Sequence, residues 1–270
     1  MPFGDHLRTW RQRRRLSQMD LAVEADISSR HLSFLETGRS RPSRDMILHL
    51  SNHLQVPLRD RNVLLHAAGY APIFPERTLD QPDLAAARRT IDTLLKAHEP
   101  FPALAIDRHW HLISANTAVS PLLAGAAAWL LEPPVNVIRL SLHPEGIASS
   151  IVNYVEWRGH LLERLHRQLD LSADPVIADL ITEIRGYPVS NTARNQPGRN
   201  ASLAKSIAVP LQLRLPGHDS VLSFLSTTTV FGTPVDITLS ELALETFFPA
   251  DDITARFIQQ ESHDSTASTG

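Results

Sequence analysis

The sequence predicts an all-α domain of five helices followed by an α+β domain in which helices flank an antiparallel sheet. Residues 3–68 contain short apolar-patterned segments with polar or proline-containing breaks, whereas the chain beyond residue 102 alternates between strand-like and helix-like periods. Between these regions, the stretch 71–82 contains three prolines and little periodicity, which is typical of a linker. We therefore expect one domain at 1–70 and another at 83–260, joined by a linker at 71–82.

The second region begins with an amphipathic helix expected over 84–98, where Ile91, Leu94 and Leu95 recur at helical spacing. Two short apolar runs then predict a hairpin, and an apolar stripe predicts a long helix. The expected elements, in chain order, are hairpin strands at 102–107 and 109–115, a helix at 147–169, an exposed loop at 186–202, paired strands at 206–215 and 220–230, a strand within 239–248 and a disordered tail at 261–270.

Composition excludes several classes of protein. The 270 residues include no cysteine, so disulfides, thiolate zinc sites and cysteine nucleophiles are all excluded, in keeping with a reducing compartment. The N-terminus has no charged-then-apolar signal pattern, and the most apolar stretch, 124–131, is far shorter than the ~20 residues that a membrane span needs. We therefore expect a cytoplasmic protein that does not bind membranes.

Charge is distributed unevenly along the chain, although its net value is only -3. Residues 1–70 contain 11 arginines against seven acidic residues, whereas the remaining 200 residues carry a net charge of -7. Arginine is the cation best suited to bidentate contact with phosphates and base edges. This pattern indicates a module that binds polyanions, attached to a domain that does not.

Most positions between Leu16 and Glu36 have a mechanical reason for their residue type. Ser17 and Ser28 can each cap a helix. Asp26 falls at the sharp turn between these helices, where a left-handed backbone is needed, and Asp is among the few residues that tolerate it. The segment therefore predicts two short helices joined by a tight turn.

The second of these helices is expected to point its first polar residues outward, because its leucines face the core. Arg30 is then placed to read guanine in the DNA major groove. The arginines that follow are placed to bind backbone phosphate, although each taken alone could equally be a solvated surface charge. The candidate DNA contacts are Gln18, Ser28, Ser29, Arg30, Ser33, Arg39, Arg41 and Arg44.

These residues resemble the XRE helix-turn-helix family of phage-repressor type, over about residues 3–68. The motif LSQMDLAVEADISSRHLSFLE, with Gly38 and Arg39 and then Pro42 and Ser43, carries the resemblance. Asp26 departs mildly from it, because many relatives have glycine there. The resemblance implies that Arg11 pairs with Glu36 and ties the first helix to the third.

The remainder of the chain resembles the MmyB-like regulators, XRE proteins with a PAS-like C-terminal ligand-binding domain. The runs AAGYAP at 67–72, AIDRHW at 105–110, LHP at 142–144, FGTP at 231–234 and FFPAD at 247–251 carry this resemblance. It implies a sensor without a required cofactor, whose pocket takes a hydrophobic small molecule, with a long-chain fatty acid as one candidate.

A PAS-like half barrel encloses a cavity between its sheet and helices, so large apolar residues on both could line it. The same residues could equally be plain core, and the polar candidates for holding a carboxylate could equally be solvated. The candidate ligand-binding residues are Trp110, His143, Asn153, Tyr154, Trp157, Arg158 and Phe224.

Neither a metal site nor an enzyme is expected. His160, Glu163 and His166 share a helix face, but no second cluster completes a zinc site. The sequence contains no Gly-x-Ser-x-Gly, no glycine-rich phosphate loop and no His-Glu-x-x-His.

Two functional hypotheses remain. In the first, a homodimer binds a palindromic operator in double-stranded DNA, and the second domain senses a hydrophobic molecule and contributes to dimerisation. In the alternative, the second domain binds another protein and no small molecule, so the chain is a DNA-tethered interaction module.

Overall fold

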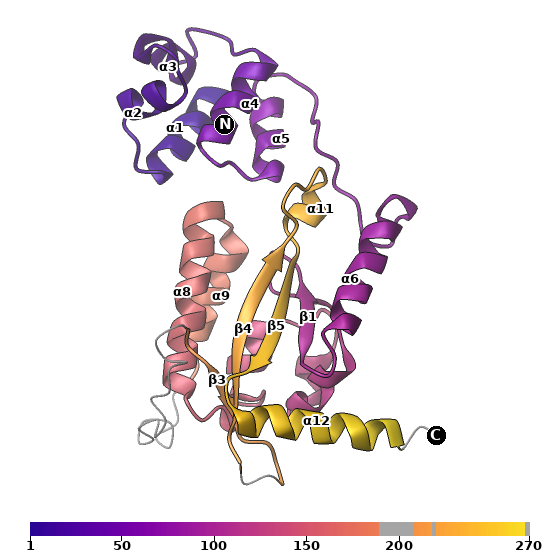
Figure 1. Ribbon diagram of the computed structural model, residues 1–270. Coiled ribbons are helices and arrows are strands. Elements are labelled where there is room, and N and C mark those ends of the chain that lie inside the picture. Colours follow the sequence, from indigo (N-terminus) through magenta and orange to yellow (C-terminus); the bar gives the residue numbers. More distant parts are fainter. Residues whose placement is uncertain (189–207, 218–219, 268–270) are drawn as a thin grey trace. The chain divides into compact units, whose positions relative to one another are not determined.

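The computed structural model describes residues 1–188, 208–217 and 220–267, of which only the backbone is described beyond 260 (Figure 1). The chain divides into two compact units. The first contains residues 1–78 together with the short segments 170–172 and 233–240, and the second contains the remainder. None of the described helices is long and apolar enough to cross a bilayer.

Residues 1–78 fold into five α-helices, which confirms the predicted all-α class. Ser17, Ser28 and Ser43 cap the second, third and fourth helices, because each hydroxyl oxygen accepts a hydrogen bond from a backbone N–H of the first turn. Buried apolar side chains from all five helices form one core. The helices are α1 (Phe3–Arg13), α2 (Gln18–Glu24), α3 (Ser29–Glu36), α4 (Arg44–His53) and α5 (Leu58–Ala67).

Two backbone positions allow these helices to pack closely. Asp26 adopts the predicted left-handed conformation, with φ of +50°, in the turn between α2 and α3. Gly4 lies where α1 meets the end of α3, and a Cβ there would lie 2.3 Å from the carbonyl oxygen of Glu36. A side chain at position 4 would therefore push the two helices apart.

The first part of the predicted linker is attached to α5. Asn62 Oδ1 accepts hydrogen bonds from the backbone N–H groups of Ile73 and Phe74, and its amide nitrogen donates to the carbonyl oxygen of Phe74. Arg59 forms a bidentate ion pair with Glu76. Residues 73–76 are thus held by side chains of the first unit, although they form no helix or strand.

Beyond residue 78 the chain forms an antiparallel sheet with helices on both faces, as the predicted α+β class requires. The strand order is β2-β1-β5-β4-β3. The elements are α6 (Ala85–Ala97), β1 (Ala103–Ile106), β2 (Leu112–Ala115), α7 (Val137–Leu142), α8 (Tyr154–Ser172), α9 (Pro175–Gly186), β3 (Leu211–Leu213), β4 (Leu222–Val230), α11 (Ile237–Ser240), β5 (Ala243–Pro249) and α12 (Asp252–Ala267), with short 3₁₀ helices at Pro82–Leu84, Thr117–Leu123, Ala128–Leu131 and Ala148–Ser150.

The alternation of side chains along the central strands creates two cores. Ala105 of β1 and Leu244 of β5 pack with Ile91 and Leu95 of α6 on one face of the sheet. Ile106 of β1, with residues of β3 and β4, packs on the other face against α7, α8 and α9. Figure 1 shows α6 on one side of the sheet and α8 and α9 on the other. The larger core lies on the side of α8 and α9.

The structure differs from the sequence expectation in three places. The long helix α8 begins at Tyr154 and not at residue 147, because Ile151 forms a β-bridge with Leu213 and Val152 donates to the carbonyl oxygen of Gln212. Strand β3 is shorter than predicted. Helix α12 continues to Ala267 and includes most of the expected disordered tail, since each residue added to a formed helix gains a backbone hydrogen bond.

The other predicted elements of the second domain are present. The first amphipathic helix, the first hairpin, the pairing of β3 with β4 and the last strand all lie where the sequence placed them. Most of the loop expected at 186–202 lies outside the described residues.

Candidate functional sites

A buried ion pair connects α1 to α3. Arg11 Nε lies 2.6 Å from Glu36 Oε1, and Arg11 Nη2 lies 3.0 Å from Oε2. Arg11 also donates to the carbonyl oxygen of Leu16, so its guanidinium holds the start of the α1–α2 connection as well. The Glu36 side chain is 0% exposed and that of Arg11 is 10% exposed. The pairing implied by the family resemblance is therefore confirmed.

Glu36 is charged despite its burial. Burial by itself would raise the pKa of the Glu36 carboxyl, but hydrogen bonds from Arg11 and Gln18 and the charge of Arg11 outweigh it, so the pKa is lowered. The Gln18 side-chain amide donates to Glu36 Oε2 at 2.8 Å. Gln18 was predicted to contact a DNA phosphate, and that contact stays a prediction, because its backbone N–H and the second N–H of its side-chain amide are not used by Glu36.

The predicted DNA-reading residues begin at the cap of α3. The hydroxyl of Ser28 accepts from the backbone N–H of His31, and it is therefore a structural cap in addition to a candidate DNA contact. Ser29 and Ser33 are half-buried, whereas Arg30 is exposed. Arg30, on the first turn of α3, has the length and the exposed guanidinium that reading a base edge requires.

Two aromatic rings lie beside the exposed arginines, and neither was predicted from the sequence. The guanidinium carbons of Arg30 and Arg39 lie 5.3 and 6.0 Å from the centre of the Phe34 ring. Those of Arg41 and Arg44 lie 5.8 to 5.9 Å from the Tyr70 ring. Cation–π contact restricts the arginine side chains without using their N–H donors. The helical spacing of Phe34 four residues after Arg30 could have indicated the first pair.

Tyr70 is itself fixed, because its hydroxyl donates to the carbonyl oxygen of Pro42 at 2.9 Å. Arg41 adds a hydrogen bond of 3.3 Å to the carbonyl oxygen of Ala68. The predicted phosphate-binding arginines 41 and 44 therefore gather around the end of α5, while Arg30 and Arg39 gather at α3.

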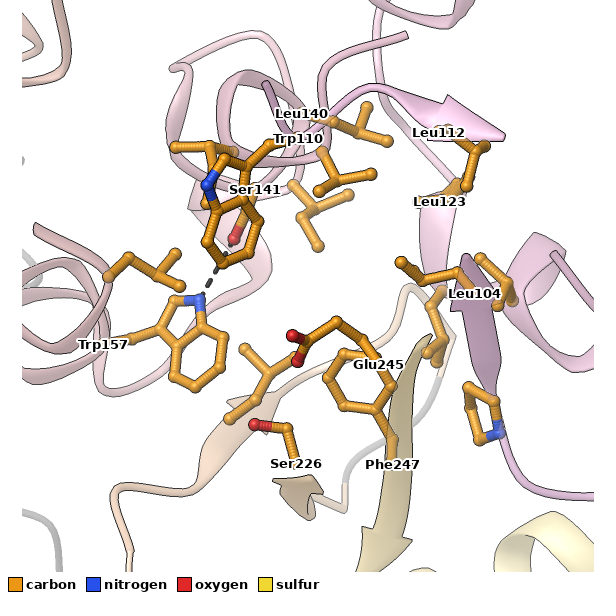
Figure 2. A pocket seen from close by; sticks show the side chains of 18 of the residues that line it. Leu104, Trp110, Leu112, Leu123, Leu140, Ser141, Trp157, Ser226, Glu245 and Phe247 are labelled. Carbon is orange, nitrogen blue, oxygen red and sulfur yellow. Dashed lines mark hydrogen bonds between the residues drawn. The ribbon is translucent and has the colours of Figure 1, made fainter. Parts of the chain in front are cut away.

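The second unit contains an apolar cavity of about 100 Å³ on the side of the sheet that faces α8 (Figure 2). Its walls come from all five strands, the 3₁₀ helix 117–123, α7 and α8. Apolar side chains make up most of the lining, including Leu104, Leu112, Leu123, Leu140 and Phe247. An apolar pocket with a few polar groups is the usual form of a small-molecule site.

Four polar side chains reach this cavity. Arg164 of α8 and Glu245 of β5 form a bidentate ion pair, with Nη2–Oε1 at 2.5 Å and Nη1–Oε2 at 3.2 Å. The other two are Ser141 and Ser226. None of the four was predicted as a ligand-binding residue. The ion pair joins positions 81 residues apart, so no local sequence pattern indicates it.

Both predicted tryptophans line the cavity. Trp157 Nε1 donates to Ser141 Oγ at 3.1 Å, and Trp110 Nε1 donates to Gln168 Oε1 at 2.9 Å. Trp110 has a positive φ of +67°, which is strained for a bulky residue. The turn that it occupies is held by Asp107, whose carboxylate accepts from the backbone N–H groups of His109 and His111. This strained turn positions the Trp110 indole at the cavity.

Tyr154 and Phe224 are buried in the same core but do not line the cavity. The Tyr154 hydroxyl donates to the carbonyl oxygen of Leu142 at 3.0 Å, so it has a partner within the core. Phe224, on β4, is completely buried. The structure therefore places two of the four predicted aromatic residues at the cavity and two in the packing around it.

The predicted polar anchors also lie away from the cavity lining. Asn153 binds β3, donating to the carbonyl oxygen of Pro210 and accepting from the backbone N–H of Gln212. Arg158 donates to the carbonyl oxygens of Ile184 and Arg185 at the C-terminal end of α9. The His143 ring packs edge-on against Trp129 and Tyr187. Their roles as ligand anchors stay predictions, and the contacts seen are structural.

The two histidines that share a face of α8 each have other contacts. The His160 ring stacks on Trp157, and His166 Nδ1 lies 2.5 Å from the carbonyl oxygen of Leu162. A different group, Asp107, His109 and His111, brings three possible ligand atoms within 4.8 Å of one another. His111 there lies 3.1 Å from Asp107, while His109 lies 2.9 Å from the Asp174 carboxylate, so ordinary hydrogen bonds account for this cluster.

Comparison with known proteins agrees with this division of the chain. Residues 2–64 match the model of a helix-turn-helix domain family, and residues 87–260 match that of the MmyB-like transcription regulator ligand binding domain. Both matched families are domains of transcription regulators and not of enzymes.

The chain is also similar to the uncharacterized HTH-type transcriptional regulator RghRB of Bacillus subtilis (strain 168). The two are 41% identical over 76 residues, which is 28% of this chain. The matched region spans about half (52%) of the length of that relative. The five-helix unit and the cavity-bearing unit thus correspond to two known domain families, and the chain belongs to the family defined by the MmyB-like transcription regulator ligand binding domain.

Proposed function

We propose that this chain is a sequence-specific DNA-binding transcription regulator whose second domain senses a hydrophobic small molecule. The observation that carries the proposal is the apolar cavity within residues 87–260, the region that matches a ligand-binding domain. The exposed arginines around Phe34 and Tyr70 support the DNA-binding half. The chain acts as a homodimer, because one helix-turn-helix module buries little surface and paired recognition helices match a palindromic operator.

In the DNA-binding half, Arg30 reads a base, and Arg39, Arg41 and Arg44 bind phosphates. A base contact specifies sequence, whereas a phosphate contact adds affinity on every sequence. Selection of binding sites from a random duplex library would provide the operator. Arg30→Ala should then weaken binding to that site by about 1–3 kcal/mol and relax the preference at one base position.

Arg44→Ala is the matched control for Arg30→Ala. It should weaken binding to all sequences equally and reduce the dependence of affinity on salt. If Arg30→Ala behaves in the same way as Arg44→Ala, then Arg30 is a phosphate contact and the reading of α3 is wrong.

In the sensing half, a ligand with an apolar body occupies the cavity beside Trp110 and Trp157. The family resemblance makes a long-chain fatty acid one candidate. For the ligand to act as a switch, it must bind the DNA-competent and DNA-incompetent states with different affinity, because equal binding shifts nothing. A coupling of ~1–3 kcal/mol between the two sites is typical of such regulators.

Native mass spectrometry of the purified protein tests this half first, because it reports bound small molecules and oligomeric state together. Operator affinity is then measured for ligand-free and ligand-loaded protein at one salt concentration. Equal affinities would overturn the sensor. A protein that binds DNA, takes up no apolar compound and requires another protein for its effect would support the interaction module instead.

A further inference from the structure

The polar groups of the cavity define what kind of ligand head it can accept. Figure 2 shows Glu245 and Ser226 reaching the cavity from the strands, with Trp157 and Ser141 on another wall. The Trp157 indole N–H is already bound to Ser141, and that of Trp110 is bound to Gln168. The groups that remain for a ligand are therefore the ion pair, the Ser226 hydroxyl and the O–H of Ser141, whose oxygen accepts from Trp157.

The single arginine of the lining is neutralised within the protein. Arg164 meets Glu245 through two hydrogen bonds and donates a further one of 3.0 Å to Thr228 Oγ1, which in turn donates to Glu245 at 2.8 Å. Its guanidinium also lies 4.7 Å from the centre of the Trp110 ring. The Glu245 side chain is only 5% exposed and that of Arg164 is 19% exposed. The lining thus carries no net charge.

A charged ligand head would disturb this balance. A carboxylate that bound Arg164 would either displace Glu245, which would leave a buried carboxylate without its partner, or bind beside Glu245 through the remaining guanidinium N–H groups and bring two negative charges together. An ammonium group would be attracted by Glu245 but repelled by Arg164, so the pair would give it no net attraction. An uncharged head needs neither rearrangement, and it can exchange hydrogen bonds with groups that are already in place.

Ser226 provides such a group. It lies opposite Phe247 in the strand register and shares a face of β4 with Thr228, two residues further along. Within the described part of the chain, its hydroxyl makes no hydrogen bond. Since a serine hydroxyl both donates and accepts, it can bind an alcohol, an ester or an amide.

We propose that the cavity selects an uncharged amphiphile, with an apolar chain among the leucines and an alcohol, ester or amide head at Ser226 and the Arg164–Glu245 pair. This inference rests on the proposed sensing function and narrows its ligand class, because it excludes carboxylates such as fatty acids. Glu245 acts here as the group that rejects anions.

Titration calorimetry of the full-length, delipidated protein with 1-octanol, octanoate and octylamine tests the inference at pH 7.5. The alkyl chain of octanoate is one carbon shorter than those of the other two probes, which accounts for about 0.8 kcal/mol, or roughly fourfold in affinity, so the head group decides any larger difference. We expect 1-octanol to bind at least tenfold more tightly than either charged probe. If octanoate binds as tightly as octanol, the inference is overturned while the sensing function stands. If none of the three binds, the cavity does not take apolar ligands and the proposed sensing function fails with it.

Two variants test which side chains determine the preference for octanol over octanoate. Glu245→Gln leaves Arg164 without its anion, so octanoate affinity should rise at least tenfold relative to octanol affinity. Ser226→Ala leaves the ion pair intact and should weaken octanol three- to tenfold with little effect on octanoate. Because Ser226 is half-buried with no hydrogen-bond partner among the described residues, this second variant tests the inference even if Glu245→Gln folds poorly. Unchanged selectivity in both variants would place the ligand head elsewhere and contradict the assignment.

Discussion

The two units each contain a bidentate arginine–glutamate pair, and the pairs differ in what surrounds them. Arg11 and Glu36 are enclosed by helices, and Gln18 donates a further hydrogen bond to Glu36 Oε2, which Arg11 also binds. Arg164 and Glu245 have similar distances, but they face a cavity and not a packed core. The same chemical pair can therefore hold two helices together or present a polar surface to a ligand, depending on the space beside it.

This difference has an energetic consequence. Breaking a pair that is enclosed leaves a charge with no alternative partner, whereas a charge beside a cavity can reach water or a neighbouring hydroxyl. We therefore expect the first pair to control the stability of the five-helix unit, and the second to control ligand choice more than stability.

Glu36→Gln should have the largest effect. Removing the charge leaves Arg11 buried and uncompensated, which typically costs about 3–5 kcal/mol. Hydrogen exchange measured by mass spectrometry should show faster exchange in α1 and α3, with α8 unchanged. Glu24→Gln, on the exposed side of α2, is the control and should leave exchange as it was. Normal exchange in Glu36→Gln would mean that the pair is not what holds α1 to α3.

Glu245→Gln should destabilise the second unit less, by about 1.5–3 kcal/mol, the range for hydrogen bonds to charged groups. Arg164 keeps Thr228 and the Trp110 ring as neighbours. Exchange in β5 and α8 reports this change. If the loss equals or exceeds that of Glu36→Gln, the contrast between the two pairs is wrong.

Gly4→Ala tests the closeness of α1 and α3 without touching a charge. Overpacking of this kind costs about 1–3 kcal/mol, because the new Cβ meets the backbone carbonyl of Glu36. Gly159→Ala in α8 is a matched control, since no atom lies within 4 Å of its added Cβ. That control should gain about 0.5–1 kcal/mol, because alanine favours a helix over glycine. Equal effects of the two substitutions would contradict the close contact.

The smallest expected effect is that of pH on the first unit. The folded pKa of Glu36 lies below that of an unfolded glutamate, ~4.3, so its contribution to stability is present above that pH and is lost as pH falls through the folded pKa. Urea midpoints followed by amide NMR signals of α3 at pH 7 and pH 4 measure the loss. Glu36→Gln should show a weaker dependence on pH. An equal dependence would assign the effect to other carboxylates.

The local features of the first unit could be predicted from the sequence because they depend on neighbouring residues. The caps at Ser17 and Ser28 and the left-handed turn at Asp26 each involve contacts within a few positions. The Arg11–Glu36 pair spans 25 residues, and it was accessible only through the family resemblance.

The ligand cavity was harder to predict, because its lining is set by strand register and helix position. Trp110 and Trp157 were predicted from their large side chains and their positions on expected elements. Tyr154 and Phe224 share these properties, but they lie in the packed core and not in the cavity lining. Asn153 looked like a free polar residue on a helix, yet β3 pairs there and the helix starts later. No sequence pattern joins Arg164 to Glu245, since one lies on a helix and the other on a strand far along the chain.

The placement of the tryptophans gives the molecule a built-in optical reporter. Two of the four, Trp110 and Trp157, border the cavity, whereas Trp10 is packed in the five-helix core with two arginines over its ring. A ligand that displaces water from the cavity changes the surroundings of the first two indoles and leaves those of Trp10 as they were. Ultraviolet emission of the unlabelled protein should therefore shift to shorter wavelength as the cavity fills, and in a variant that keeps only Trp10 among the four the shift should vanish.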